Sequence, residues 1–176
     1  MTVSEKTRAI VWTGMFAAII AVMAQIAIPL PSSVPITLQT FAIALCGYFM
    51  QSKKGTASVL VYLMLGAVGI PVFANFKGGL GVLIGVTGGF LYGFLLMAFL
   101  CGLSEKAKAV PIRILLGLCG LAAAHIAGII HFSLVTSNSF GKSFLLVSLP
   151  YLLKDAVSVV CAYFFAELLK KRIRRI

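Results

Sequence analysis

Charged residues are scarce in this chain, and acidic residues are the scarcest of them. Only 11% of the 176 residues are charged, and four residues are acidic, whereas a typical soluble domain has roughly 25% charged residues. Hydrophobic residues make up 61% of the chain, and its mean hydropathy is +1.09. A soluble chain of this length would need more polar residues to cover its surface. The composition therefore excludes an ordinary soluble domain and indicates a protein surrounded by lipid.

Motifs for catalysis and nucleotide binding are also missing. Gly141-Lys142-Ser143 resembles the end of a phosphate-binding loop, but Thr136 occupies the place of the glycine that this loop requires. His125 and His131 point to different faces of a helix, and no nucleophile motif accompanies them. Two roles are open to these histidines: proton transfer, or a hydrogen bond inside a helix bundle. We expect neither enzyme activity nor ATP hydrolysis nor a cofactor from this chain.

Cysteine is too scattered for a metal or redox centre. The chain contains no Cys-x-x-Cys pair, and each cysteine lies within an apolar run. We expect these thiols to act as small buried hydrophobic groups, and we predict no metal site. The cysteines are Cys46, Cys101, Cys119 and Cys161.

The positive charge of the chain is distributed in clusters. The formal net charge is +11, which in a soluble protein would suggest nucleic acid as the partner. Here the basic residues lie between apolar runs, and no basic groove with interleaved aromatic residues is visible, so we expect no nucleic-acid binding. Clusters of this kind are typical of cytoplasmic loops that face the anionic lipid bilayer.

Six apolar runs alternate with these clusters. The first run is close to the ~20 residues that cross a bilayer and exceeds the ~7–15 residues of a signal-peptide core, so we interpret it as a span. Three runs are shorter, which is typical of transporters in which unwound backbone lines a cavity. We predict an all-α integral membrane protein that forms a single domain over residues 1–176. Its six transmembrane helices are expected at Ala9–Ile28, Leu38–Gln51, Gly55–Gly69, Gly88–Leu103, Ile112–Phe132 and Tyr151–Leu169.

Most of the fifteen basic residues fall on one side of this six-helix arrangement. Lys77 and Lys142 fall on the other side, and Lys154 lies inside the last span. The positive-inside rule then places both termini in the cytoplasm. The cytoplasmic clusters contain Lys6, Arg8, Lys53, Lys54, Lys106, Lys108, Arg113, Lys170, Lys171, Arg172, Arg174 and Arg175.

Two outer loops have unusual compositions. Pro29–Thr37 contains three prolines and no charge, which favours a rigid, extended cover rather than a helix. Gly69–Gly79 is apolar and is interrupted by glycine and proline. A solvent-exposed loop would not be expected to carry Phe73 and Phe76. We therefore predict that this segment folds back against the helices as a re-entrant lid.

Asp155 is the acidic residue that falls well inside a predicted span, since Glu167 lies at the basic end of the last span, where Lys170 and Lys171 can neutralise it. A charge in the bilayer costs at least ~2.5–3.5 kcal/mol, so this residue is expected to face an internal cavity and to have a function. Lys154 precedes it, but successive helix residues point about 100° apart, and a simple local salt bridge is not expected. Lys154 is interpreted either as a second functional group or as a side chain that snorkels to the surface.

Small residues recur at the four-residue spacing that lets two helices approach closely in lipid. We expect packing inside the protein for a stripe that consists of Gly81, Gly85, Gly89 and Gly93. Ala17 and Ala21 repeat the spacing in the first span, beside Gly14 and Ala18. There a surface for a partner protein is the favoured interpretation.

Four segments of the sequence resemble the signature segments of a known family. They are Val34–Phe41, Gly69–Gly79, Gly85–Phe94 and Leu149–Asp155. In their order and spacing they are similar to those of the biotin-specific substrate-binding subunits (S components, the BioY family) of energy-coupling factor (ECF) transporters. The resemblance covers essentially the whole chain.

This resemblance implies a membrane-embedded vitamin-capture protein of the bacterial cytoplasmic membrane, with biotin bound near its outer surface. Transport would require a transmembrane coupling subunit and two ATP-hydrolysing subunits. Ala17 and Ala21 resemble the small-residue motif by which such subunits dock on the coupling subunit. The alternatives are an S component of the same fold for another vitamin and a stand-alone facilitator of biotin uptake. Thiamin or riboflavin would favour a tryptophan in the site, whereas Trp12 lies at the cytoplasmic end.

The sequence departs from the family pattern in two places. Val86 stands where the family usually has proline. The last motif of the family commonly reads Pro-Gly-Asp, with a lysine three residues after the aspartate. Here Lys154 precedes Asp155, and Ser158 takes the later position. The role of the aspartate carries over to Asp155, whereas Lys154 either replaces the lysine of the family or does not.

The chemistry of biotin assigns expected roles to these residues. Its ureido ring has two N–H donors, and a buried donor without an acceptor costs roughly 1–3 kcal/mol. Asp155 is suited to accept from these N–H groups, and Asn75 or Gln39 would donate to the ureido carbonyl. Lys154, Lys77 or solvent would meet the carboxylate. The rest of the expected site consists of Phe73, Tyr92 and Tyr151 around the apolar body, with Gly88 and Gly89 beside them.

Overall fold

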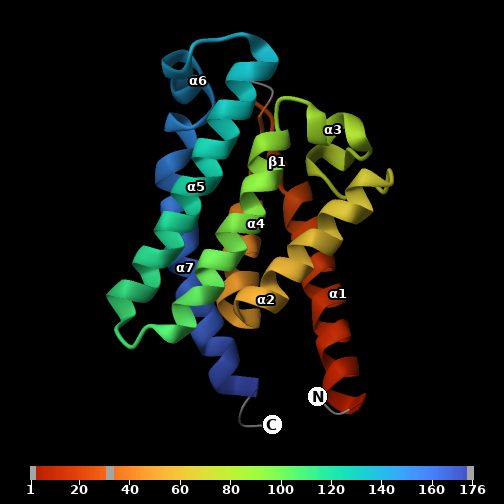
Figure 1. Cartoon of the computed structure of the whole chain (residues 1–176), viewed down its shortest axis with the longest axis vertical. Helices are drawn as coiled ribbons and strands as arrows, with labels where there is room; N and C mark the ends of the chain where they lie inside the picture. Colours follow the sequence, from red (N-terminus) through yellow and green to blue (C-terminus); the bar gives the residue numbers. More distant parts are fainter. Residues whose placement is uncertain (1–2, 31–33, 174–176) are drawn as a thin grey trace.

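The computed structural model describes residues 3–30 and 34–173, and its fold is almost entirely helical. The helices pack as an elongated bundle, and short elements connect them (Figure 1). The helices of the described residues are α1 (Val3–Gln25), α2 (Gln39–Ala67), α3 (Leu80–Ile84), α4 (Gly88–Leu103), α5 (Val110–Thr136), α6 (Phe140–Val147) and α7 (Leu149–Ile173). The short elements are the strands β1 (Ala27–Ile28) and β2 (Ile36–Thr37) and the 3-10 turns η1 (Ala74–Phe76) and η2 (Ser104–Lys106).

α2 is a hairpin of two helical arms. At Gln51 the backbone leaves the helical region, with φ of 67° and ψ of 172°, and the chain turns back (Figure 1). Gly55 then meets the first arm so closely that a Cβ there would lie 3.0 Å from the Cα of Gly47. Farther from the turn, the Nε2 of Gln39 donates to the hydroxyl of Tyr62 at 2.9 Å. The two arms therefore lie side by side, at the positions of the second and third predicted spans.

Three helical segments are long and apolar enough to cross a membrane, and the bent pair of α6 and α7 makes a fourth if it counts as one span. The three are Glu5–Gln25, Gly88–Lys106 and Val110–Thr136, and α6 meets α7 at 54°. Each arm of α2 is shorter than the ~20 residues that cross a bilayer. The chain is thus a helical, multi-pass membrane protein with three or four full-length candidate spans among its described residues. The count of six spans stays a prediction.

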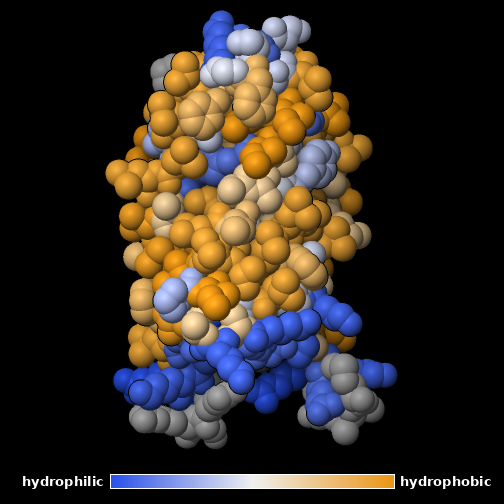
Figure 2. Space-filling model, turned by 60° about the vertical axis from the view of Figure 1, so that its left-hand side comes forward, coloured by the Kyte–Doolittle hydropathy of each residue, from blue (hydrophilic) through white to orange (hydrophobic). Residues whose placement is uncertain are grey.

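The surface divides into an apolar belt and a charged end. Figure 2 shows hydrophobic residues around the middle of the molecule and a band of hydrophilic residues at its lower end. α1 begins and α7 ends at this lower end (Figure 1). Glu167 of α7 pairs with Lys170 at 3.2 Å and with Arg113 at 3.8 Å. Both ends of the described chain therefore lie on one side of the belt, as an even number of crossings requires. The cytoplasmic location of that side stays a prediction.

Small residues bring α4 and α5 into close contact. A Cβ added at Gly93 would lie 2.6 Å from the Cα of Ala124, so a larger residue would force the two helices apart. The stripe predicted from Gly81 to Gly93 is not continuous, because the chain leaves the helical conformation between α3 and α4. Gly89 and Gly93 are buried as expected, but Gly81 is exposed.

The upper end of the molecule, opposite to the chain termini, is built from segments that do not cross the belt (Figure 1). β2, at the end of the loop Pro29–Thr37, pairs antiparallel with β1, so Ile36–Thr37 is extended as predicted, and residues 31–33 lie outside the description. Residues Gly69–Gly79, here called the lid segment, fold back on the bundle as predicted, and Phe73 is 2% exposed. Phe76 differs from the prediction, at 73% exposure, because its backbone turns the side chain outward. α3 and α6 had no counterpart among the predicted spans.

Gly93→Ala should lower the thermal stability of the detergent-solubilised protein, because the new methyl group overlaps α5. Overpacking of this kind costs about 1–3 kcal/mol. Gly14→Ala is the matched control, since a Cβ at Gly14 of α1 would meet no atom within 4 Å. Thermal unfolding of the two variants measures the difference, and equal midpoints would contradict the close contact between α4 and α5.

Candidate functional site

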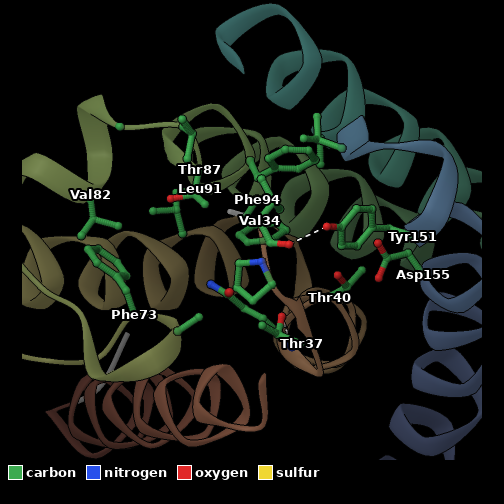
Figure 3. Close-up of a pocket in the computed structure, with 18 of the residues that line it drawn as sticks. Val34, Thr37, Thr40, Phe73, Val82, Thr87, Leu91, Phe94, Tyr151 and Asp155 are labelled. Atoms are coloured by element: carbon green, nitrogen blue, oxygen red, sulfur yellow. Dashed lines mark hydrogen bonds between the residues drawn. The ribbon is translucent and has the colours of Figure 1, made fainter. Parts of the chain in front are cut away.

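A cavity of about 240 Å³ lies near the upper end of the bundle. Its wall comes from the connection between β1 and β2, the first arm of α2, the lid segment, α3 to α5 and the junction of α6 with α7. The volume is slightly below the ~300–1,000 Å³ typical of small-molecule pockets. In Figure 3, Phe73 and Val82 lie at one side of the cavity, and Tyr151 and Asp155 lie at the other. The cavity therefore has an apolar end and a polar end.

The polar end is organised around Asp155, which is 5% exposed. This residue lies near the start of α7. His125 of α5 places its Nε2 3.3 Å from the Oδ2 of Asp155, and the ammonium of Lys154 forms an ion pair with Oδ1. Thr40 of α2 lies beside the same carboxylate (Figure 3). The buried charge thus has a cation and hydrogen-bond donors around it, as a charge inside a protein requires.

His125 connects Asp155 to the junction between α6 and α7. Its Nδ1 lies 2.9 Å from the hydroxyl oxygen of Ser148. A proton on Nε2 lets the ring donate to the carboxylate, and in the neutral ring Nδ1 then accepts from the Ser148 hydroxyl; this tautomer is assigned from the partners. His131 lies with its Nε2 3.0 Å from the Gly85 carbonyl. Of the two roles that the sequence left open, hydrogen bonding within the bundle therefore fits both histidines.

Lys154 ties the first outer loop to Asp155. Its Nζ donates to the carbonyl of Thr37 at 2.7 Å and pairs with the carboxylate of the neighbouring Asp155. The expectation that two successive helix residues would not form a local salt bridge was therefore wrong. The reason is the length of the lysine side chain, whose flexible four-carbon stem carries the ammonium back over the next residue although the two Cα–Cβ bonds diverge.

A second bond fixes the same loop. The hydroxyl of Tyr151 donates to the carbonyl of Val34 at 2.5 Å, which is drawn as a dashed line in Figure 3. Tyr151 and Lys154 both belong to α7, and their two acceptors both belong to the segment that precedes α2. The start of α7 therefore holds this segment against the polar end of the cavity.

Aromatic side chains form the apolar end. Phe73 of the lid segment lies edge-on to Tyr62 of α2, with ring centroids 5.5 Å apart. Its ring also lies so close to Gly66 that any Cβ at that position would overlap it. Phe90 and Phe94 of α4 also line the cavity, but Phe90 lies edge-on to His125 of the polar end, with ring centroids 5.7 Å apart. The lid segment thus supplies one aromatic wall of the cavity, and α2 provides the socket that receives it.

Most of the predicted site residues are brought together at the cavity. Gln39 lies there at 5% exposure, whereas Asn75 is exposed at the rim and has a left-handed φ of 59°. The structure shows where these residues lie, and ligand binding by them stays a prediction. The predicted residues that line the cavity are Asp155, Lys154, Asn75, Gln39, Phe73, Tyr151 and Lys77.

Three predicted site residues lie outside the cavity wall. Tyr92 is 44% exposed, and its ring contacts that of His131, with centroids 6.1 Å apart. Gly88 and Gly89 are buried where α4 meets its neighbours, and a Cβ at Gly88 would lie 3.0 Å from the Nε2 of His131. The physical reason for these glycines is therefore close packing around α4 rather than a place against the cavity.

Four polar cavity residues, Thr37, Thr40, Thr87 and His125, were not predicted as site residues. A polar side chain within an apolar span is itself a sign of function, and that signal was present for His125. The lining leucine and phenylalanine residues of α4 and α5 carry no such signal, because apolar residues look alike in an apolar helix whether they face lipid or a cavity.

The small residues of α1 divide between two faces. Ala17, predicted to meet a partner, is 1% exposed and packs inside the bundle, and Ala21 is half-buried. Gly14 and Ala18 are exposed instead. α1 therefore uses Ala17 for its own close packing, and its exposed small residues are Gly14 and Ala18.

The chemistry of this cavity is that of binding. Among residues 3–30 and 34–173, no group of three His, Cys, Asp or Glu side chains is placed to hold a metal ion. An enclosed apolar space with a few fixed polar groups is the usual form of a small-molecule site. The fold and this site define a membrane-embedded binding protein for a small ligand. The sequence matches the BioY family over residues 1–175, and the chain belongs to that family.

Named relatives agree with this assignment. The biotin transporter BioY of Thermotoga maritima is 40% identical over 165 residues, which cover 93% of this chain and 96% of that protein. The probable biotin transporter BioY of Pyrococcus horikoshii is 36% identical over 165 residues, with coverage of 94% and 98%. The crystal structure of the S-component for biotin from an ECF-type ABC transporter matches with a TM-score of 0.86 at 26% identity, over 97% of this chain and 95% of that one. The resemblance found in the four sequence segments is confirmed.

Lys154→Met should destabilise the protein, because the buried carboxylate of Asp155 then loses its cation. Removing one partner of a buried pair leaves a penalty of about 1–3 kcal/mol or more. The double variant Lys154→Met/Asp155→Leu should recover stability, since both charges are gone. Thermal unfolding in detergent measures the effect, and Lys142→Met, at an exposed lysine, is the control. A double variant less stable than Lys154→Met would contradict the role assigned to the pair.

Proposed function

We propose that this protein is a membrane-embedded subunit that binds biotin with high affinity and mediates its uptake together with an ECF energising module. The observation that carries this proposal is the partly enclosed cavity with Asp155 at its polar end and the aromatic ring of Phe73 at its apolar end. Biotin has matching parts: a ureido ring that donates hydrogen bonds, an apolar thioether ring and an anionic tail. The names of the relatives, biotin transporter BioY, support the same ligand.

The ureido ring is placed against Asp155 in this proposal. The carboxylate oxygens already lie beside His125 and Lys154, but each oxygen has further lone-pair sites and accepts additional N–H groups. A buried ureido N–H without an acceptor would cost roughly 1–3 kcal/mol, so an acceptor at this end selects for such a ring. Gln39 at the inner wall or Asn75 at the rim would donate to the ureido carbonyl.

The anionic tail of the ligand is placed next to the lid segment in this proposal. Lys154 is engaged by Asp155 and Thr37, whereas Lys77 lines the cavity and forms no ion pair among the described residues. Lys77 is paired with Phe73 through the backbone, and Phe73 lies across the cavity from Asp155 (Figure 3). A ligand with its ureido ring at Asp155 would therefore extend its carboxylate toward Lys77.

Energy for uptake is assigned to partner subunits. This chain has no nucleotide-binding motif, and its solved structural relative is described as an S-component from an ECF-type ABC transporter. A transmembrane coupling subunit and two ATP-binding subunits would therefore drive transport, and α1 would face the coupling subunit through Gly14, Ala18 and Val22, which are exposed. The basic lower end would lie in the cytoplasm, with both termini, in a bacterial cytoplasmic membrane.

Detergent-purified protein should bind biotin, and should not bind thiamin or riboflavin, in a calorimetric titration. Asp155→Asn should weaken biotin binding by roughly 10- to 100-fold, because an amide nitrogen replaces one buried acceptor. Lys142→Gln changes an exposed lysine of α6 and should have no effect. Absence of biotin binding by the unaltered protein would refute the proposal, and equal effects of the two variants would mean that the site lies elsewhere.

The orientation of the ligand has its own test, in which biotin is compared with its neutral primary amide. Lys77→Gln should weaken biotin by about two- to fivefold, the value of an exposed ion pair, because the lysine charge faces the tail. The same variant should leave affinity for the amide unchanged, since the amide carries no charge to lose. An equal loss for both ligands would contradict the placement of the carboxylate beside Lys77.

A further inference from the structure

The side chain of Gln25, the last residue of α1, is bonded to the lid segment. Its Nε2 donates to the carbonyls of Val72 and Phe73, each at 3.1 Å. Its Oε1 accepts from the backbone N–H of Phe76 at 2.8 Å. A single amide therefore holds the backbone of the lid segment just before the turn η1 and at the last residue of that turn.

The turn that this amide holds has an unfavourable backbone. Asn75 and Phe76 have φ values of 59° and 55°, in the left-handed region that residues other than glycine adopt at a cost. Two bonds between Phe73 and Lys77 close the turn, at 2.9 and 3.2 Å, but both lie inside the turn and do not attach it to the bundle. Its position over the cavity therefore depends on contacts with the helices.

Contacts with α2 hold the two ends of the lid segment, and at its start the N–H of Ile70 donates to the Leu65 carbonyl at 3.1 Å. The ring of Phe73 occupies its socket at Gly66, and the N–H of Gly79 donates to the Gly66 carbonyl at 2.7 Å. These contacts attach the lid segment to α2. Gln25 attaches it to α1 and hydrogen-bonds to the turn η1 itself.

We propose that Gln25 is a positioning residue that latches the lid segment over the cavity and thereby sets the rate at which a bound ligand leaves. Phe73, Asn75 and Lys77 of the lid segment line the cavity, so displacement of this segment opens the wall. A ligand enclosed by a mobile element leaves when that element opens locally, and bonds that are broken in the open state slow its departure. The identity of the ligand in this inference rests on the proposed function.

An amide is the group that this position requires. The three bonds to the lid segment need two donated hydrogens and one acceptor at the end of one side chain, and glutamine supplies both. Glutamate has the same length and would still accept from Phe76, but it would direct an oxygen at the carbonyls of Val72 and Phe73. Leucine has a similar volume and makes none of the three bonds. Both replacements should therefore release the lid segment.

A purely structural role for Gln25 makes a different prediction. Its Nε2 also lies 3.2 Å from the carbonyl of Ala21, one turn back in α1, so the amide could serve only to finish that helix. In that case its loss would loosen the end of α1 and lower overall stability, while the lid segment would keep its wild-type protection. Amide hydrogen exchange, resolved by segment, distinguishes the two roles.

The experiment compares Gln25→Leu and Gln25→Glu with Gln51→Leu in the full-length, detergent-purified protein. Gln51 is the matched control, since its Nε2 donates to Glu105 at 2.8 Å at the opposite end of the molecule. We expect both Gln25 variants to raise the rate of biotin dissociation, measured by chase of labelled biotin, at least ~10-fold, the combined effect of losing two or more hydrogen bonds. The rate of amide hydrogen exchange should rise in residues 69–79 and should not rise in α4 and α5.

Each outcome decides for or against the latch. Wild-type dissociation rates in both Gln25 variants would overturn it, and so would an increase in exchange spread evenly over α1, α4 and α5. A tenfold faster dissociation in Gln51→Leu would also overturn it, because the effect would then not depend on the lid segment. If the unaltered protein binds no biotin, the proposed function fails, and the exchange of residues 69–79 without ligand still decides whether Gln25 holds the lid segment.

Discussion

A buried carboxylate inside an apolar bundle must be surrounded by cations and donors, and Asp155 imposes this requirement on the upper end of the molecule. An isolated charge there would cost at least ~2.5–3.5 kcal/mol, and three elements meet to reduce that cost. α5 supplies His125, α7 supplies Lys154, and α2 supplies Thr40. Lys154 also binds the Thr37 carbonyl, so the same cation brings the first outer loop over the acid. The polar end of the cavity is therefore a consequence of satisfying one charge.

The cavity exists because close packing below it is combined with short, irregular segments above it. Glycine and alanine let α4 meet α5 without intervening side chains, as at Gly93 and Ala124, and such contacts hold these helices rigidly against each other. Above them the chain leaves helical geometry in the lid segment and between α3 and α4. Segments with left-handed residues do not fill space as regular helices do. The closely packed helices therefore form a rigid lower part, and the irregular segments above them enclose the cavity.

The sequence predicted those features that depend on one strong signal. The span Gly88–Leu103 is bounded by glycine and by a basic loop, and α4 has the same limits. Asp155 was placed in the cavity because charge is rare in lipid. The length of a flexible side chain decides whether Lys154 reaches its neighbour, and residue spacing does not contain that information. The helical period similarly does not say which of two adjacent small-residue faces is buried, so Ala17 was assigned to the surface although it is 1% exposed.

α1 occupies a distinct position in this arrangement. In its candidate span 22% of the residues are buried, against 56% for the span that contains α4. Its displacement would therefore cost less than displacement of the span that contains α4, because the cost of moving an element follows the apolar area that it buries. The end of α1 carries Gln25, which is bonded to the lid segment. Of the three full-length candidate spans, the one with the smallest buried share thus ends in a side chain that is bonded to the cover of the cavity.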